Sequence, residues 1–347
     1  MRHIKTIGID LAKNVFQLHA VDSKGKKIFA KRIGRQALKE LMVTMPRCTV
    51  AIEACTGAHY WARLLKSYGH EIKMISPQFV KPYVRGSKND KNDSQAIVRA
   101  SSDPDMKYVP IKTIEQQEMQ MLHRTRELLI KQRTAQSNQL RGFLAEFGIV
   151  TVQGLSATHQ LPKLVDEHNG LLSTRGKQMF MRMYEHFNYL DKEVNEYDKQ
   201  IQNMAKTDVR CVELMKLEGV GPLVSTIVVS TLGDGHAFKN GREAAAYLGL
   251  VPKQFSSGNK IYLGGITKRG DRYARKSIIQ GARSVVKVSD KKSDRKSQWV
   301  SKIKEKGGFN KASVALANKQ VRIMWAILRT GECYRSTQAD ELLKKVV

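Results

Sequence analysis

The chain has 347 residues and is 41% hydrophobic, which is enough for two or three domains with real cores. Its 60 Lys and Arg residues against 32 Asp and Glu give a formal charge of +28, which implies a polyanionic partner. No apolar run reaches the ~18–20 residues of a spanning helix, the N-terminus lacks a signal peptide's apolar region, and the four cysteines form no CxxC pair. We therefore expect a reduced, cytoplasmic protein and exclude a membrane protein, a zinc site and a disulfide scaffold.

The positive charge is concentrated in the last third of the chain. From Lys239 onward there are 25 basic and 8 acidic residues, a net +17. This region is therefore expected to face nucleic acid.

The first 110 residues alternate between strand and helix patterns. Three strands separated by turns are expected at 5–12, 14–21 and 27–33, forming a meander. Further strands are expected at 48–53 and 71–75, and helices at 36–45, 57–68 and from 77 to 84. A meander followed by alternating helices and strands predicts a mixed α/β domain.

Four acidic residues lie within or at the ends of these elements. Asp10 lies in an apolar strand and Glu53 ends another, while Asp90 and Asp93 share one face of a helix start. A carboxylate in an apolar strand is unfavourable unless it is paired or binds a cation, and Mg²⁺ prefers oxygen ligands. The alternatives are a turn residue at Asp10, a cap at Glu53 and a polar helix N-terminus at Asp90 and Asp93.

The middle of the chain is helical in pattern. One long helix is expected at 114–148, a loop at 154–168 and a second long helix at 177–205. Apolar residues at heptad-like spacing in both predict an antiparallel coiled-coil arm.

A Gly-x-Gly turn joins two apolar helical patterns at 214–225. In a helix-hairpin-helix motif, Gly219 and Gly221 would let the backbone approach a phosphate. A structural hinge with the same pattern is the alternative.

A loop-rich hairpin is expected at 252–265, with Ser256 and Ser257 at its centre. The serines could be plain turn residues, or one could be a nucleophile held near cations. No His lies close by, so a Ser-His-Asp hydrolase is not expected. A basic helix follows Asp271, the Lys- and Ser-rich segment 288–308 is expected to be mobile or to face DNA, and a final helix is expected at 311–329. The basic residues that would serve phosphates here are Lys253, Lys260, Lys268, Arg269, Arg272 and Arg275.

Taken together, these motifs resemble the bridge-RNA-guided DEDD transposases of bacterial insertion sequences, the family numbered one hundred and ten. The N-terminal matches are Gly8-Ile9-Asp10-Leu11-Ala12-Lys13, Ile52-Glu53-Ala54-Cys55-Thr56-Gly57 and Lys88-Asn89-Asp90-Lys91-Asn92-Asp93. The C-terminal matches are Leu217-Glu218-Gly219-Val220-Gly221-Pro222, Ala245-Ala246-Tyr247-Leu248-Gly249-Leu250, Phe255-Ser256-Ser257-Gly258-Asn259-Lys260 and Thr267-Lys268-Arg269-Gly270-Asp271. At Cys55 and Ser94 the chain departs from the sequence that many members of the family have, and both differences resemble variation between subgroups. The matches cover nearly the whole chain in order.

The resemblance implies three domains: an RNase H-like (RuvC-type) α/β domain at 1–110, a coiled-coil arm at 111–207 and a mainly α transposase domain at 208–347. It implies that Asp10, Glu53, Asp90 and Asp93 bind Mg²⁺, and that Ser257 attacks DNA and becomes linked to it, with Ser256 as the neighbour that a one-residue slip would substitute. The implied partners are donor and target DNA, a non-coding bridge RNA and further copies of the chain, from dimer to tetramer, in a bacterial cytoplasm near the nucleoid.

Three hypotheses follow. The first is a DNA recombinase that works through a phosphoserine intermediate. The second is a Mg²⁺-dependent nuclease or junction resolvase that uses water. The third is a nucleic-acid-binding protein with a degenerate acidic site.

Overall fold

The computed structural model of the chain describes residues 3–86, 89–258 and 260–334. Two motif residues of the sequence analysis, Lys88 and Asn259, lie outside these ranges. The chain forms two compact units, Met1–Thr113 and Ile114–Val347, which are described separately. No helix within the described ranges is both long and apolar enough to cross a membrane. The boundaries predicted at 110 and 207 remain predictions.

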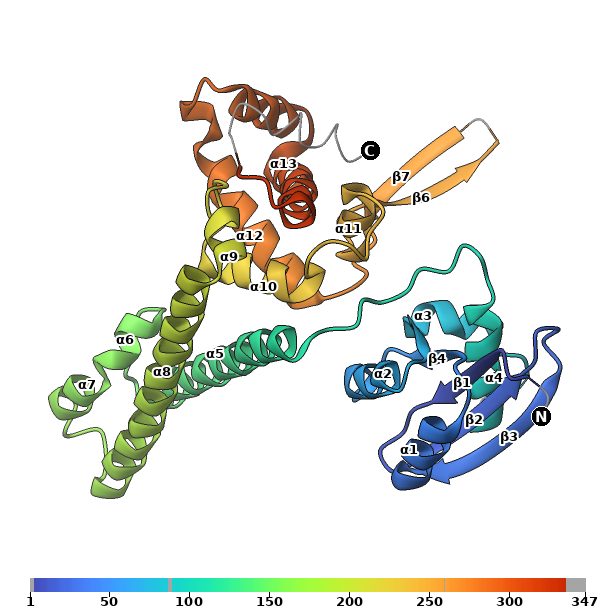
Figure 1. The fold of residues 1–347 in the computed structure, drawn as a ribbon. Helices are drawn as coiled ribbons and strands as arrows, with labels where there is room; N and C mark the ends of the chain where they lie inside the picture. The colour runs from blue at the N-terminus through green and yellow to red at the C-terminus, as the bar shows by residue number, and fades with distance from the viewer. Residues whose placement is uncertain (1–2, 87–88, 259, 335–347) are drawn as a thin grey trace. The chain divides into compact units, whose positions relative to one another are not determined.

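The first unit is built on one five-stranded sheet with the order β3-β2-β1-β4-β5 (Figure 1). Strand β1 pairs antiparallel with β2 and parallel with β4, so the meander edge is antiparallel and the other edge is parallel. The strands are β1 (Thr6–Asp10), β2 (Val15–Val21), β3 (Lys27–Gly34), β4 (Thr49–Glu53) and β5 (Glu71–Ile75). The predicted α/β class is confirmed, and the mixed sheet is consistent with an RNase H-like domain.

Helices cover both faces of this sheet. Alternate residues of β1 and β4, such as Ile9 and Ile52, are fully buried in one cluster with Leu38 and Trp61 from α1 and α2. The opposite face, represented by Ala51, packs in a second cluster with α4. The helices are α1 (Arg35–Thr44), α2 (Ala58–Ser67), α3 (Pro77–Val80), the 3₁₀ turn η1 (Lys81–Tyr83) and α4 (Asp90–Ser101).

Two long helices open the second unit, as the sequence predicts. They are α5 (Ile114–Glu146) and α8 (Thr174–Thr207). Arg126 pairs with Asp198 at 2.6 Å, and seven residues further along α5, Arg133 pairs with Asp191, seven residues back along α8. The two helices therefore pass each other antiparallel. A supercoil of coiled-coil type remains a prediction.

The loop predicted at 154–168 is wrong, because most of it forms α6 (Leu155–His159) and α7 (Leu161–Glu167). Leu161 and Val165, at i and i+4, are 1% and 2% exposed and join a small core with the two long helices. Pro162 stands in the first turn of α7, where a proline costs no helical hydrogen bond. The burial of this apolar stripe outweighs the breaker signals of the sequence.

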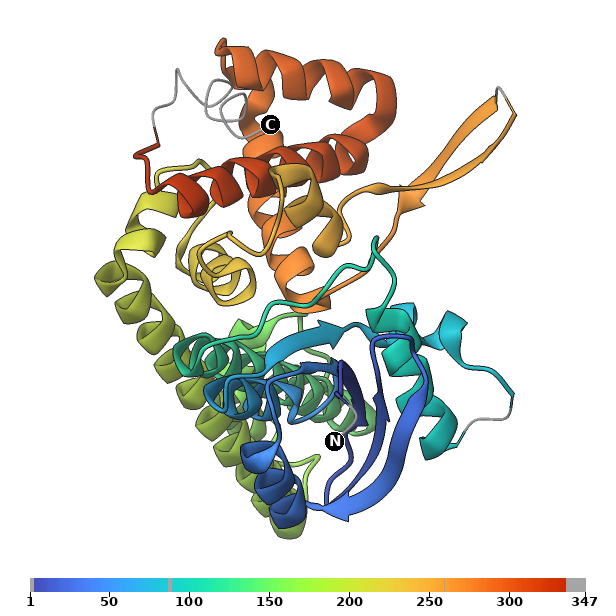
Figure 2. The ribbon, with the colours of Figure 1, turned by 45° about the vertical axis from the view of Figure 1, so that its right-hand side comes forward.

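The rest of the second unit is mainly helical, as expected. Its helices are α9 (Val209–Leu214), α10 (Pro222–Leu232), α11 (Gly241–Tyr247), α12 (Arg272–Val288), the 3₁₀ turn η2 (Ser289–Lys291) and α13 (Arg295–Thr330). They share one apolar core that includes Ile227, Val228 and Trp325. A two-stranded hairpin of β6 (Pro252–Ser257) and β7 (Lys260–Ile266) stands apart from these helices in both views (Figures 1 and 2).

Segment 288–308 is also more regular than its composition predicted. From Arg295 onward it forms the first part of α13, and Asp294 caps that helix by accepting from the Ser297 amide at 3.0 Å. Val300, three residues after the buried Ser297, is fully buried. Gly308, with φ of 82°, then kinks the helix. The lysines of this part of α13 are exposed or half-buried, whereas Ser297 packs inside.

Candidate active site

Two of the four predicted acids lie side by side at the ends of neighbouring strands. Asp10 is the last residue of β1 and Glu53 the last of β4, and the register between these parallel strands pairs Ile9 with Ile52. Because Ile9 and Ile52 point into the core, the next residue on each strand points to the opposite face. Asp10 and Glu53 thus extend, half-buried, from one face and one end of the sheet.

The surroundings of the Cys55 thiol agree with this placement. Its Sγ lies 3.8 Å from the Leu11 carbonyl oxygen. Burial raises the pKa of Cys55, and the carboxylates of Glu53 and Asp10 raise it further. Both carboxylates therefore lie near the same thiol.

The other two acids share the first turn of α4. Asn89 caps this helix by accepting from the Asn92 amide at 2.8 Å, so the capping part of the alternative interpretation also holds. Asp90 is exposed and Asp93 is half-buried. A helix start can thus supply both a cap and two carboxylates.

A glycine in β1 brings α4 against the strand that carries Asp10. A Cβ at Gly8 would lie 2.5 Å from the Ser94 backbone oxygen and 2.6 Å from Val98 Cγ2, so no side chain fits there. Gly8 is two residues before Asp10 and faces the same side. The helix bearing Asp90 and Asp93 therefore packs on the sheet face from which Asp10 and Glu53 extend.

All four donors are carboxylates, which suit a hard cation such as Mg²⁺. Within residues 3–86, 89–258 and 260–334, however, no three His, Cys, Asp or Glu side chains are grouped so that they could hold a metal ion. The structure places Asp10 beside Glu53, and Asp90 and Asp93 in one helical turn. Their convergence into one coordination set remains a prediction. Mg²⁺ needs only one or two protein carboxylates when water and phosphate oxygens complete its shell, so the donor chemistry fits.

The two candidate serines belong to the β6–β7 hairpin of the second unit, where both are exposed. Ser257 is the last residue of β6 and pairs with Lys260, the first of β7. Ser256 pairs with Ile261, and its hydroxyl accepts from Gln254 Nε2 at 3.0 Å. Adjacent strand residues point to opposite faces, so the two hydroxyls do not share a side of the hairpin.

A buried arginine ties down the base of this hairpin. Arg275 Nη1 donates to the Arg269 carbonyl at 2.6 Å and to the Leu248 carbonyl at 3.2 Å. Arg275 is only 8% exposed, and burial lowers its pKa. The prediction that Arg275 contacts nucleic acid does not suit this position; its guanidinium instead joins the segments on either side of the hairpin. The other predicted basic residues of this region are exposed: Lys253, Lys260, Lys268, Arg269 and Arg272.

The Gly-x-Gly turn has two differently placed glycines. A Cβ at Gly219 would lie 2.5 Å from the Gly281 carbonyl oxygen of α12, so this glycine is required by packing. A Cβ at Gly221 would meet nothing within 4 Å. The structural alternative therefore accounts for Gly219, while Gly221 remains a predicted phosphate contact.

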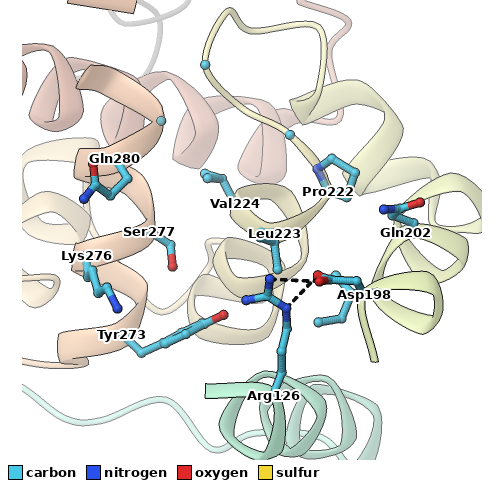
Figure 3. Close-up of a pocket in the computed structure, with 14 residues that line it drawn as sticks. Arg126, Asp198, Gln202, Pro222, Leu223, Val224, Tyr273, Lys276, Ser277 and Gln280 are labelled. Atoms are coloured by element: carbon cyan, nitrogen blue, oxygen red, sulfur yellow. Dashed lines mark hydrogen bonds and ion pairs between the residues drawn. The ribbon is translucent and has the colours of Figure 1, made fainter. Parts of the chain in front are cut away.

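Gly221 lines a cavity of about 430 Å³ that the sequence analysis did not anticipate. Arg126 and Asp198 lie on one side of it, with their ion pair drawn in Figure 3, and Tyr273 and Lys276 of α12 lie on the other. These residues come from segments more than 70 positions apart. The local signals in the sequence are the Gly-x-Gly turn and the basic helix that follows Asp271.

Buried hydrogen bonds fix one wall of the cavity. The Thr226 hydroxyl donates to the Pro222 carbonyl at 2.6 Å, so its oxygen accepts from His123 Nε2 at 2.9 Å. His123 Nδ1 then accepts from the Tyr273 hydroxyl at 3.1 Å. Burial lowers the pKa of His123 to about 4, so the ring is neutral at pH 7. The wall is therefore held by one defined histidine tautomer.

Comparison with known proteins matches both units to one family. Residues 7–149 match a transposase family model of the DEDD, IS110 type, and residues 211–298 match the model described as transposase IS116/IS110/IS902 family. The chain is 42% identical over 336 residues to a probable family 20 transposase of Pseudomonas aeruginosa, covering 96% of this chain and 99% of the relative.

Two further relatives carry names of insertion sequences. The transposase for insertion sequence element IS1111A of Coxiella burnetii is 39% identical, over 96% of this chain and 92% of its own length. The transposase for insertion sequence element IS1328 of Yersinia enterocolitica is 36% identical, over 96% and 99%. With the acid-bearing sheet of the first unit and the helical second unit both matched, the chain belongs to the IS110-type family of insertion-sequence transposases.

Proposed function

We propose that this transposase cuts and rejoins DNA through a covalent bond to Ser257, with Mg²⁺ held by Asp10, Glu53, Asp90 and Asp93. The observation that carries the proposal is the placement of Ser257, an exposed hydroxyl opposite Lys260 on a hairpin whose base is fixed by a buried arginine. A nucleophile that attacks DNA must be reachable yet held by a rigid support.

In the proposed step, Ser257 Oγ loses its proton and forms a bond to phosphorus. The bond from phosphorus to one deoxyribose oxygen breaks, and that oxygen takes up a proton. The bond energy is kept in the phosphoserine ester, so a second DNA end can reverse the step without ATP. When bound, Mg²⁺ would stabilise charge that develops on the phosphate oxygens. Lys260, opposite Ser257, favours the approach of the phosphate.

The acids and the serine belong to different compact units, Asp10 to the first and Ser257 to the second. The proposed chemistry therefore needs the two units to act on one phosphate. As the family resemblance implies, we propose that they come from different copies in a dimer to tetramer.

We further propose that a non-coding bridge RNA guides the reaction, as the resemblance implies. The +28 charge supports the presence of more than one polyanion, because each phosphate contact needs a cation. Sequencing the RNA that co-purifies with the full-length protein tests this part. Recovery of only heterogeneous cellular RNA would contradict guidance by a dedicated RNA.

The test of the serine uses two adjacent hydroxyls. Ser257→Ala should abolish the covalent protein–DNA adduct seen on a denaturing gel with DNA carrying the element's ends, while Ser256→Ala should retain it. Asp10→Asn should lower adduct formation at least about a hundredfold, because a charge that acts on the transition state is lost.

The alternative is a Mg²⁺-dependent nuclease that uses water. It predicts that Ser257→Ala still cuts DNA and leaves free ends. An adduct of normal yield in Ser257→Ala would reject the proposed nucleophile.

A further inference from the structure

The β6–β7 hairpin exposes an unusual amount of apolar side chain. Phe255 and Tyr262 are 66% and 59% exposed, and Ile261 and Leu263 are 72% and 62% exposed. Two-stranded hairpins are marginally stable in water without a packed face. Large exposed apolar groups gathered on one element mark a contact surface.

The strand register divides these side chains between two faces. Phe255 pairs with Tyr262, and Ser257 with Lys260, and paired residues point to the same side. Phe255 and Ser257 are two residues apart, so all four side chains share one face, here called the aromatic face. The opposite, aliphatic face carries Gln254, Ser256, Ile261 and Leu263.

Lys253 extends the aromatic face toward the base of the hairpin. A Cβ at Gly264 would lie 3.5 Å from the Phe255 ring and 3.8 Å from Lys253 Cβ, so these side chains flank the same glycine. From the base of the hairpin outward, the aromatic face therefore carries Lys253, then the pair of Phe255 and Tyr262, then the pair of Ser257 and Lys260. Between Pro252 and Ile266 the sequence contains no Asp or Glu.

This combination selects one kind of occupant. Single-stranded nucleic acid is bound by aromatic rings on which bases stack and by cations that pair with its phosphates. A duplex hides the faces of its bases, so it cannot use both rings. The aliphatic side chains that suit a protein interface lie on the other side of the hairpin.

We infer that the aromatic face holds unpaired DNA bases next to the phosphate that Ser257 attacks, with Phe255 and Tyr262 as positioning residues. Two residues of strand span roughly 7 Å, on the order of two stacked-base spacings. A base on either ring thus places a phosphate within about two nucleotides of Ser257. The inference rests on the proposed function for the identity of that phosphate, and on the hairpin alone for the stacking.

The test uses the full-length protein and an oligothymidylate that carries one 2-aminopurine, whose fluorescence falls when it stacks. The double variant Phe255→Leu with Tyr262→Leu keeps apolar, exposed positions but removes both rings. It should weaken binding of the single-stranded probe by about ten- to a hundredfold and remove the quenching. The matched control, Ile261→Ala with Leu263→Ala, changes the aliphatic face and should retain both. Thermal unfolding followed by circular dichroism confirms that each variant is folded.

Two results would overturn the inference. One is unchanged binding and quenching in the aromatic variant. The other is a change in its oligomeric state by mass photometry with quenching intact, which would make the aromatic face an interface between copies.

The probe does not require Ser257, so the two proposals fail separately. Ser257→Ala should quench like the parent protein. If Ser257→Ala also forms the adduct normally, Ser257 is not the nucleophile, but the proposed stacking on the aromatic face is still supported.

Discussion

Replacing Gly281 with alanine tests the contact that holds the Gly-x-Gly turn. A Cβ on Gly281, in the middle of α12, would come closer than 3.0 Å to the Gly219 carbonyl oxygen, an approach that real Cβ atoms essentially never show. Both groups are backbone, so no rotamer change relieves the clash. Gly142, inside α5 of the same unit, offers the matched control because a Cβ there meets nothing within 4 Å.

Both substitutions add helix propensity, but only Gly281→Ala also introduces a steric clash. Glycine to alanine within a helix stabilises by roughly 0.5–1 kcal/mol at both sites. At Gly281, forced separation of α12 from the turn costs about 1–3 kcal/mol, a typical figure for overpacking. The helix-propensity gains cancel in the comparison, so Gly281→Ala should be about 1–3 kcal/mol less stable than Gly142→Ala. At about 2–4 °C per kcal/mol for a unit of this size, the melting temperatures should separate visibly.

Thermal unfolding of the full-length variants measures this difference. Hydrogen exchange of peptides from α10 and α12 then locates it, since these elements should lose protection only in Gly281→Ala. Equal melting temperatures and equal exchange for the two variants would refute the close approach of the turn to α12.

Two further predictions concern charge. Because burial lowers the pKa of His123 to about 4 from an unfolded value near 6.5, the unfolded chain binds more protons at this site below pH 6.5, and the contribution of His123 to stability should fall by about 2 kcal/mol between pH 7.5 and pH 5. His123→Gln should flatten that dependence in urea unfolding while the exposed His186→Gln should not, and an unchanged slope in His123→Gln would exclude His123 as its source. Lys253→Gln with Lys260→Gln should weaken binding to random-sequence DNA and reduce the slope of log K against log salt by about 2, measured by anisotropy, whereas a slope equal to that of the parent protein would show that neither lysine contacts phosphate.

The elements that carry the acids could be predicted from the sequence because their signals are local. The strands ending at Asp10 and Glu53 alternate or run apolar over five residues each, and Asn89 before Asp90 is a strong helix cap. Parallel pairing of β1 with β4 then follows from the helical connection between the strands. Local patterns thus account for the first unit well.

Contacts between distant segments could not be predicted in this way. Nothing near Arg275 in the sequence indicates that its side chain is used inside the fold, because its partners lie on a turn six residues back and a helix end 27 residues back. The breaker residues around Leu155 and Pro162 predicted a loop, while the apolar residues that make two helices there gain their stability from α5 and α8. Glycine-rich patterns share this ambiguity, since Gly219 and Gly221 have the same signal but different neighbours.

The serine assignment depends on which face of the hairpin each hydroxyl occupies. Phe255 and Ser257 lie two residues apart on β6 and share a face, whereas Ser256 points to the opposite face. On either face the hairpin offers no Asp, Glu or His that could take a proton from the hydroxyl. A serine hydroxyl is a weak nucleophile without a base or a cation. Under the proposed function, Ser257 therefore stays inactive until DNA brings it to the carboxylates of the first unit and their cation, so cutting would be confined to the assembled complex.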